Sequence, residues 1–421
     1  MSLAPLSPLR HRDFALVWTA ALVSNVGTWM QTVAVGVLVT LHTGQAKWTG
    51  LVAAAAFLPM GLLSPVGGAM ADRHDRRRWL LLTTVGETVF ACILTVLAAT
   101  GHAGPVPVTL AVLGGGAMTA IGFPAYQAML PDLVGPDDLL GAISLSSAQW
   151  NLGRVIGPAL AGVVIALGGY TWAFGLNAAS FGAVMLALVL VRYRPGARPS
   201  VQGHLLARIA DGVRAAAAEP GCRTAIILIA VVALLASPFI ALVPAMAIKL
   251  FHHKASGTAV LVTAQGIGAV IGALALTPLA DRLGRRRVLV ADLVLLPVVL
   301  ALYGLAPTFA VAVGALLVVG AAYIGVLAGL NTVVQLRAPE AQRGRILSLY
   351  MVGLGVIYPI GAIIQGAVAD RIGLRTVVVG TAALLLFVLV AAAVWRPNLK
   401  AFLDDPRRGR TTLDSLEPTV A

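Results

Sequence analysis

The sequence predicts an all-helical membrane protein that crosses the bilayer twelve times. Hydrophobic residues make up 59% of the 421-residue chain and charged residues 11%, and the mean hydropathy is +0.91. A soluble core cannot enclose this much apolar surface, so lipid must serve as its solvent. Each of twelve apolar runs is long enough, at about 20 residues, to cross about 30 Å of hydrocarbon. The expected spans are 14–41, 48–71, 79–99, 105–129, 140–166, 171–191, 224–250, 255–280, 288–306, 308–335, 346–368 and 376–395.

A charged segment between the second and third spans divides the chain into related halves. It begins with Ala71, Asp72 and Arg73 and ends with three consecutive arginines at 76–78. The same order, Ala-Asp-Arg-x-x-Arg-Arg-Arg, returns at 280–287, which is 209 positions later. Because this separation is close to half the chain length, the sequence predicts a duplicated architecture.

This segment resembles a loop motif of the major facilitator superfamily of transporters. The matching residues are Gly68, Asp72, Arg73, Arg76 and Arg77. The segments 10–14 and 25–31 narrow the likeness to the branch of bacterial drug and siderophore exporters of the enterobactin-exporter type. The resemblance covers nearly the whole chain. It implies two pseudo-symmetric six-helix bundles around a cavity that opens alternately to each side.

The distribution of basic residues predicts the domains and their orientation. We expect an N-terminal bundle at 1–192, a linker at 193–223, a C-terminal bundle at 224–396 and a disordered, expendable tail at 397–421. Of the 30 Lys and Arg residues, 24 fall on the side of the N-terminus and five on the opposite side. Cytoplasmic loops carry the excess of such residues. Both termini are therefore expected in the cytoplasm, with the protein in a bacterial inner membrane.

Within the linker, an amphipathic helix on the membrane surface is expected. Leu205, Leu206, Ile209 and Val213 recur at helical spacing, opposite Arg208, Asp211 and Arg214.

The resemblance implies a gate on the cytoplasmic side. In the family, the motif Asp and neighbouring arginines join helix ends and hold that side closed when the cavity faces outward. Basic loops could instead be orientation signals alone, but that rule does not require an Asp. The expected gating residues are Gly68, Asp72, Arg73, Arg76, Arg77, Asp281, Arg282, Arg285 and Arg286. A third Ala-Asp-Arg, at 369–371 on the outer side, is expected to connect two helices.

The fifth span carries small residues at helix-packing intervals. Gly153, Gly157, Pro158 and Gly162 resemble in part the fifth-helix motif of drug:proton antiporters, although Ser144 replaces its first Gly. Glycines at such intervals let helices approach closely, and Pro removes one backbone donor. The pattern favours export over import.

Arg154 is the basic residue that lies deep within a span. A charge at such depth costs at least about 2.5–3.5 kcal/mol, so it should face water, a partner or a substrate. Three interpretations remain open: a structural hydrogen-bond donor, a counter-charge for Glu87, and a contact for an anionic or polar substrate. Asn151, one turn earlier, could share its pocket.

Two acids lie inside spans and are candidate proton sites. They are Glu87 in the third span and Asp292 in the ninth. An acid in a low dielectric is what proton coupling requires. By resemblance, however, these helices are peripheral, and Asp292 could be a counterion for the arginines at 285–287.

Polar side chains recur in the spans that line the cavity of the family. Such residues commonly serve as hydrogen bonds between helices, which is the alternative to a binding role. The expected cavity residues are Asn25, Thr28, Gln31, Tyr126, Asn151, Arg154, Tyr323, Asn331, Gln335 and Tyr358. A cavity of this composition suits an amphipathic organic molecule better than a metal ion.

The sequence contains no phosphate-binding loop, zinc-ligand cluster or nucleophile elbow. We therefore expect no enzymatic activity, no cofactor, no metal site and no nucleic-acid partner. The predicted function is export of a small amphipathic organic compound by a monomeric proton antiporter. The alternatives are a proton-coupled importer of a small metabolite and a non-transporting membrane sensor.

Overall fold

The computed structural model describes residues 4–193, 205–395 and 402–404, and the regular structure within these ranges is helical. The elements before the linker are η1 (Ala4–Arg10), α1 (Arg12–Thr43), α2 (Ala46–Arg73), α3 (Arg76–Ala99), α4 (Pro105–Val134) and α5 (Leu139–Leu190). The later elements are α6 (Leu205–Ala218), α7 (Pro220–Leu235), α8 (Phe239–Lys249), α9 (Ala255–Leu283), α10 (Arg285–Leu305), α11 (Phe309–Arg337), η2 (Glu340–Gln342), α12 (Arg343–Val352), η3 (Gly353–Ile357), α13 (Tyr358–Ile372) and α14 (Leu374–Trp395).

Eleven helical stretches of the described chain are long and apolar enough to cross a membrane. One of them, α5, has 52 residues and contains both the fifth and the sixth predicted spans. It is interrupted at Gly169, where φ is 72° and ψ is −169°. Residues with a Cβ rarely adopt this conformation, whereas glycine adopts it readily. Gly169 therefore marks a change of direction within α5.

Two other predicted spans are interrupted as well. The seventh is α7 followed by α8, and it breaks at Pro238, which has no N–H to donate to the helix. The eleventh is α12 followed by α13, joined by the short π-helical stretch η3. The seventh also begins at Pro220, four residues before the predicted boundary at 224.

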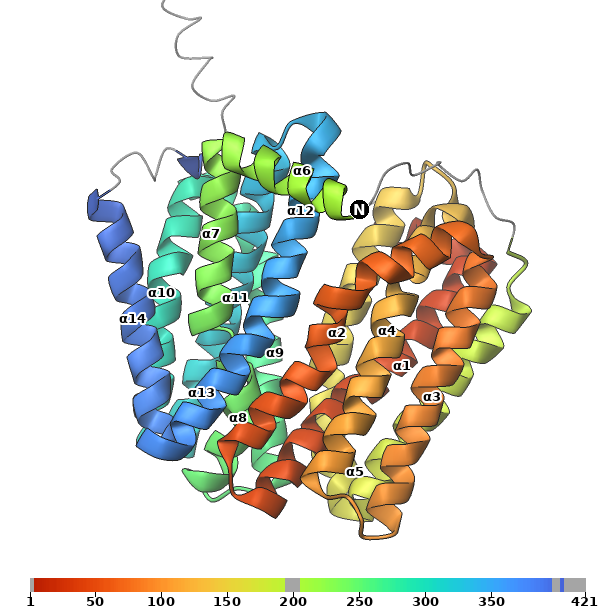
Figure 1. Ribbon diagram of the computed structural model, residues 1–421, viewed down its shortest axis with the longest axis horizontal. Helices are drawn as coiled ribbons and strands as arrows, with labels where there is room; N and C mark the ends of the chain where they lie inside the picture. Colours follow the sequence, from red (N-terminus) through yellow and green to blue (C-terminus); the bar gives the residue numbers. More distant parts are fainter. Residues whose placement is uncertain (1–3, 194–204, 396–401, 405–421) are drawn as a thin grey trace, which may run out of the picture.

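The helices form two groups, which Figure 1 shows side by side. The first group is α1–α5, in which α1 packs on α5, and α4 packs on both α2 and α3. The second group is α7–α14, in which α11 packs on α9 and α10, and α10 packs on α14. The groups meet where α2 packs on α13 and where α5 packs on α9.

The groups approach each other most closely at one end of the molecule. We call it the Asp370 end, because α13 ends there beside the start of α2 (Figure 1). A Cβ added to Gly366 would lie 2.7 Å from the carbonyl oxygen of Ala46, and one added to Gly36 would lie 2.8 Å from Cγ of Pro244. At Gly50 the backbone runs directly against Ala362. We call the opposite end, which carries both basic segments, the Asp72 end.

The linker contains the expected helix, α6, which lies at the Asp72 end. Ala215 and Ala216 are buried, whereas Val213 is 50% exposed. Asp211 pairs with Arg345 of α12 at 3.6 Å and with Arg214 at 3.2 Å. The side chains of 205–209, which include three of the four predicted apolar residues, lie outside the described residues. Small residues and an ion pair thus hold α6 against the second group.

Residues 402–404, which belong to the tail predicted to be disordered, contact the second group. Leu403 is buried, and the carboxylate of Asp404 accepts a hydrogen bond from Arg286 at 3.0 Å. The carbonyl oxygen of Asp404 accepts another from Nε of Arg337 at 2.9 Å. The low apolar content of the tail suggested disorder, but two arginines on the bundle bind this short segment. The other residues of 397–421 lie outside the described ranges.

Candidate transport site

The guanidinium of Arg154 lies at the boundary between the two groups. It belongs to α5, and its Cζ lies 5.7 Å from the centre of the Trp29 ring of α1. The phenols of Tyr323 in α11 and Tyr358 in α13 are near enough to interact with it electrostatically. Arg154 is half-buried, and it forms no hydrogen bond or ion pair with any described residue. The charge therefore lies over the ring of Trp29 and has no acidic partner among the described residues.

Aromatic side chains from both groups surround this cation. Trp29 packs edge-on against Trp150, with ring centres 5.9 Å apart. Tyr358 of the second group packs edge-on against Phe57 of α2, in the first group, at 5.6 Å. Tyr323 shares a hydrogen bond of 2.9 Å with Ser237. Rings with a single cation among them suit an aromatic or amphipathic ligand.

Two donors on helices that adjoin Arg154 are buried without a hydrogen-bond partner among the described residues. They are Nε1 of Trp29 and Nε2 of Gln265 in α9. Gln265 precedes Gly266, where an added Cβ would lie 3.2 Å from the carbonyl oxygen of Arg154. Buried donors are normally paired, so these two are candidates for contact with water or with a ligand.

The glycines of the fifth span bring α1 and α9 close to Arg154. A Cβ on Gly153 would lie 2.9 Å from Cβ of Asn25, and one on Gly157 would lie 2.6 Å from Cβ of Trp29. A Cβ on Gly162 would lie 3.0 Å from Cβ of Ala259, across the boundary between the groups. Pro158 is buried beside Gly157. This spacing of small residues allows the close helix contacts predicted from the sequence.

Several predicted cavity residues bond within their own group. Gln31 accepts a hydrogen bond of 2.8 Å from the amide of Asn177, which is fully buried. Asn151 donates to the carbonyl of Ser147, one turn earlier in α5. The backbone carbonyl of Thr28 accepts from Thr32. The structure therefore places Gln31 in a contact between α1 and α5, and the amide of Asn151 in a hydrogen bond within α5.

Three more predicted cavity residues form local polar pairs. The hydroxyl of Tyr126 donates to Oε1 of Gln149 at 3.1 Å, which joins α4 to α5. In α11, the amide of Gln335 donates to the side-chain oxygen of Asn331. Of the ten residues predicted to line the cavity, Arg154, Tyr323 and Tyr358 are those that the structure brings together.

Neither of the two acids inside the spans bonds to Arg154 among the described residues. Glu87 accepts a hydrogen bond of 2.6 Å from Thr119 of α4, and Asp292 packs against Gly325 of α11. Among the described residues neither carboxylate forms an ion pair. Arg154 does not serve here as the counter-charge of Glu87, nor does Asp292 neutralise the arginines at 285–287.

Two arginines of the first charged segment bond within the first group. Arg76 is buried, pairs with Asp132 of α4 at 3.0 Å and donates to the carbonyl of Ala128 at 2.9 Å. Arg77 donates to the carbonyl of Val189 at 2.8 Å. An added Cβ on Gly68 would meet open space, whereas one on Gly67 would lie 2.6 Å from Cα of Ile121. Gly67 is therefore the glycine that helix packing requires.

The acidic residues of the two charged segments differ from Arg76 and Arg77 in having no such bonds within the part of the chain that the structure describes. The carboxylates of Asp72 and Asp281 form no hydrogen bond or ion pair with the described residues. Asp72 is half-buried and Asp281 is exposed. In the second charged segment, Arg282 is the counterpart of Arg73 and is exposed, as is Arg285. Arg286 binds Asp404.

Asp370 joins the two groups, a contact that was not predicted from the sequence. Its two carboxylate oxygens accept hydrogen bonds from the backbone N–H groups of Ala46 and Lys47, at 2.7 and 2.9 Å. We expected the segment 369–371 to connect helices of one group, and this expectation missed the bond to α2. The signal was present in the sequence as the third Ala-Asp-Arg.

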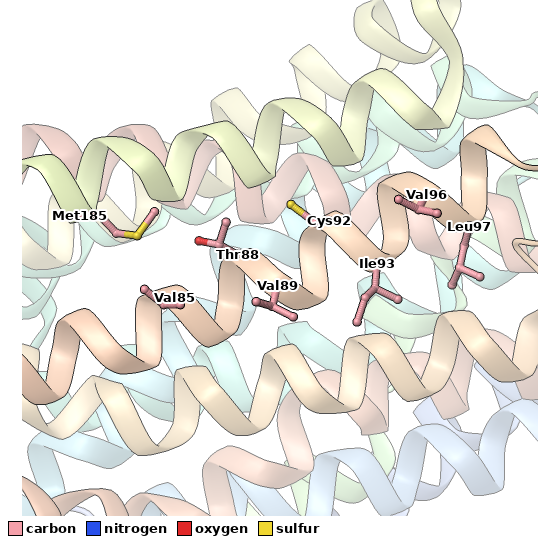
Figure 2. Close-up of a pocket in the computed structure, with 8 residues that line it drawn as sticks. All are labelled: Val85, Thr88, Val89, Cys92, Ile93, Val96, Leu97 and Met185. Carbon is pink, nitrogen blue, oxygen red and sulfur yellow. The ribbon is translucent and has the colours of Figure 1, made fainter.

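Figure 2 shows a groove of about 450 Å³ that is separate from Arg154. Seven of its eight lining side chains come from α3, including Val85 and Cys92, and one is Met185 of α5. Its lining is almost entirely apolar, so it lacks the convergent polar groups that orient a ligand. Such a groove is compatible with lipid tails.

A family model described as "Transmembrane secretion effector" matches residues 3–409. The chain belongs to this family of major facilitator transporters. It is 28% identical over 396 residues to the multidrug efflux pump Tap of Mycolicibacterium fortuitum, an alignment that covers 91% of this chain and 96% of Tap. It is 29% identical over 397 residues to the enterobactin exporter EntS of Escherichia coli O1:K1, with coverage of 90% and 92%. The predicted superfamily and its exporter branch are confirmed.

Solved structures agree on the fold. A bacterial homologue of the human lysosomal transporter Spinster, in an inward-facing and unoccupied conformation, matches with a TM-score of 0.73. The match covers 98% of this chain and 99% of that one at 14% identity. A bacterial homologue of the iron transporter ferroportin, also inward-facing, matches with a TM-score of 0.71 and 18% identity, covering 93% and 99%. The chain is thus a multi-pass transporter of major facilitator type.

Proposed function

We propose that this transporter exports a small amphipathic organic compound by proton antiport. The observation that carries the proposal is Arg154, a cation without an acidic partner among the described residues, set between Trp29 of the first group and Tyr323 and Tyr358 of the second. A ligand held there touches both groups. Its binding can therefore be coupled to their relative movement.

The proposed architecture has twelve crossings in two six-helix bundles. A helix of 52 residues would be about 78 Å long at 1.5 Å per residue, more than twice the thickness of the hydrocarbon core. We therefore assign α5 two crossings that meet at Gly169. The bundles are 1–192 and 224–396, with a linker at 193–223 and a cytoplasmic tail from 397. Access would alternate as one bundle rocks against the other.

The proposed orientation places the Asp72 end in the cytoplasm. The excess of basic residues at this end supports it through the positive-inside rule, which would put both termini inside a bacterial inner membrane. The Asp370 end then faces outward. With the groups in contact at that end, the structure would correspond to a state closed to the outside.

The gating proposal fits this state. When the cavity faces inward, the cytoplasmic gate is open, so Asp72 and Asp281 should lack partners. We propose that both acids, with Arg73 and Arg282, bond across helix ends when that side closes. Arg76 and Arg77 are better explained as supports of the segment, because they bind α4 and α5 of their own group.

For coupling we propose Glu87 first and Asp292 second. Glu87 is half-buried, and its contact is the neutral hydroxyl of Thr119 rather than a cation. A carboxyl group without a cationic partner can bind and release a proton. Glu87→Gln retains an oxygen for Thr119 but cannot carry a proton. We expect it to abolish accumulation driven by a pH gradient while exchange of substrate across the membrane continues; accumulation equal to that of the wild type would exclude Glu87.

The proposed substrate class is an aromatic or amphipathic compound that is neutral or anionic. Arg154 contributes a positive charge to its surroundings, and its described neighbours include no carboxylate bonded to it. The names of the relatives, a multidrug pump and an enterobactin exporter, are compatible with a compound of this kind. We propose that the protein acts as a monomer.

Transport by everted membrane vesicles under an imposed pH gradient would test the proposal. A panel of toxic compounds and siderophores, screened first in a deletion strain, supplies the compound to be measured. Arg154→Ala should raise the apparent KM for anionic compounds about tenfold or more while the protein remains abundant, and Arg154→Lys should retain part of the affinity. Arg371→Gln, an exposed arginine at the outer end, is the control. Uptake only into right-side-out vesicles would instead identify an importer, and no transport in either orientation would favour a sensor.

A further inference from the structure

The N-terminus of α2 receives its hydrogen-bond acceptor from the opposite group. The first N–H groups of any helix lack partners within that helix. At the start of α2 the preceding residue is Gln45, whose side chain forms no capping hydrogen bond. Both oxygens of Asp370, from the end of α13, take this place by binding the N–H groups of Ala46 and Lys47. The cap is thus supplied by a residue 324 positions away.

We propose that Asp370 is a latch that holds the outer side of the transporter closed by capping α2 across the boundary between the groups. Among the described residues, the hydrogen bonds that join the first group to the second both end on this carboxylate. The inference rests on the proposed alternation of access. It adds a positioning residue on the side opposite to the expected gate.

The charge of Asp370 makes this contact stronger than ordinary packing. The N-terminus of a helix carries partial positive charge, and hydrogen bonds to a carboxylate are roughly twice as strong as neutral ones. Lys249, at the end of α8, lies 3.9 Å from the same carboxylate and comes from its own group. Lys249 can hold the side chain in place before α2 arrives.

Other contacts at this end bring the backbones of the helices close together. Gly366 lies one turn before Asp370 and allows α13 to reach the backbone of Ala46. Gly50 does the same for α2 at Ala362. These approaches set glycines against backbone carbonyls and involve no side-chain hydrogen bond, whereas the two hydrogen bonds to consecutive N–H groups require one alignment. Opening to the outside must break both bonds at once.

The latch predicts a change in outward exposure that does not depend on any substrate. The reporter is Ala53→Cys, on α2 below the latch, where Ala53 packs against the second group. It is made in a background of Cys92→Ser and Cys222→Ser, which removes both free cysteines. Labelling by a membrane-impermeant thiol reagent applied outside intact cells then measures opening of the outer side.

Asp370→Ala should increase the labelling rate of the reporter about tenfold, because the charge-assisted bonds of the closed state are lost. Asp370→Asn retains one acceptor oxygen without the charge and should give a smaller increase. Arg371→Gln, on the adjacent exposed residue, should leave the rate unchanged. A rate for Asp370→Ala equal to that of the wild type overturns the proposal.

A second variant breaks the latch from the side of α2. Proline is well tolerated at the first helical position, and Gln45 has φ −118° and ψ 128°, a conformation favoured before proline. Ala46→Pro removes the N–H that binds Asp370, so it should also increase labelling. Combined with Asp370→Ala it should add little, because both changes remove the same bond. A fully additive increase would show that Asp370 acts elsewhere and would also overturn the latch.

The outcome separates this inference from the proposed function. If transport assays fail to find an exported compound but the Asp370 variants increase labelling, the latch stands and the assignment of substrate does not.

Discussion

The tripeptide Ala-Asp-Arg occurs three times in this chain, and the three acids are in different situations. At 369–371 the carboxylate of Asp370 binds two backbone N–H groups of the opposite group. At 71–73 and 280–282, on the opposite end, Asp72 and Asp281 form no hydrogen bond or ion pair with the described residues. The same tripeptide therefore forms a contact between the groups at one end, whereas at the other end its two acids bond to no described residue. An acid without a partner in one state of a transporter is a candidate for a partner in another.

A second contrast lies within the first charged segment itself. Arg76 is a fixed support, whereas Asp72, four residues earlier, is unpaired among the described residues. The Arg76 side chain is 10% exposed and that of its partner Asp132 is 11% exposed. Tyr193 also donates to Asp132 at 2.7 Å. One short segment thus combines a structural ion pair with a proposed gate.

The largest expected effect comes from breaking that support. Arg76→Ala leaves the carboxylate of Asp132 buried without its cation, which typically costs about 3–5 kcal/mol. We expect a large loss of thermal stability in detergent and of abundance in the membrane. Arg78→Ala, two residues later on an exposed side chain, should change stability by less than about 0.5 kcal/mol. Equal losses in the two variants would refute the structural assignment of Arg76.

A smaller effect, on turnover rather than on folding, is expected at the acids. Asp72→Asn combined with Asp281→Asn should reduce transport about tenfold, equivalent to about 1.4 kcal/mol, by removing bonds formed only when the cytoplasmic side closes. Abundance and thermal stability should remain those of the wild type, because neither acid bonds to a described residue. Asp137→Asn, on an exposed residue of the same end, is the control. Unimpaired transport by the double variant would show that the gating assignment is wrong.

The Glu219–Arg337 ion pair lies at the Asp72 end, and the stability that it contributes should depend on pH. Burial acts to raise the pKa of Glu219, but hydrogen bonds from the N–H groups of Cys222 and Gly221 and from Arg337 prevail, and its pKa is lowered. Because the pKa of Glu219 is lower in the folded state than in the unfolded state, its charged carboxylate stabilises the fold at pH values above the usual pKa of Glu. The contribution is lost as pH falls through the folded-state pKa.

The matching measurement compares wild-type protein with Glu219→Gln by thermal denaturation across pH. The wild type should be more stable at neutral pH, and the difference should shrink as the solution is made acidic. A difference that grows toward low pH would contradict the assignment of the charge to Glu219.

The helices were predicted well from the sequence because each depends on the apolar residues of its own segment. Each run of apolar residues determines its own crossing, and Gly153 and Gly157 indicated a close approach of helices before any partner was known. The contacts of side chains were less predictable, because they depend on which helices meet. Trp29 joins the surroundings of Arg154 only when α1 lies beside α5. Asp370 could not be identified as a cap until the ends of α13 and α2 were seen together.

The smallest expected effect concerns the tail, where Asp404 binds the second charged segment. The Arg286 and Asp404 side chains are 43% and 33% exposed, and ion pairs of this kind contribute about 0–1 kcal/mol. Asp404→Ala should therefore lower thermal stability by little, since its backbone carbonyl remains available to Arg337. Truncation after Arg396 removes both contacts and should cost more than Asp404→Ala. If truncation changes neither stability nor transport, the bundle orders residues 402–404 but these residues do not support the bundle. Arg286 would then be as available for the proposed gate as Arg285.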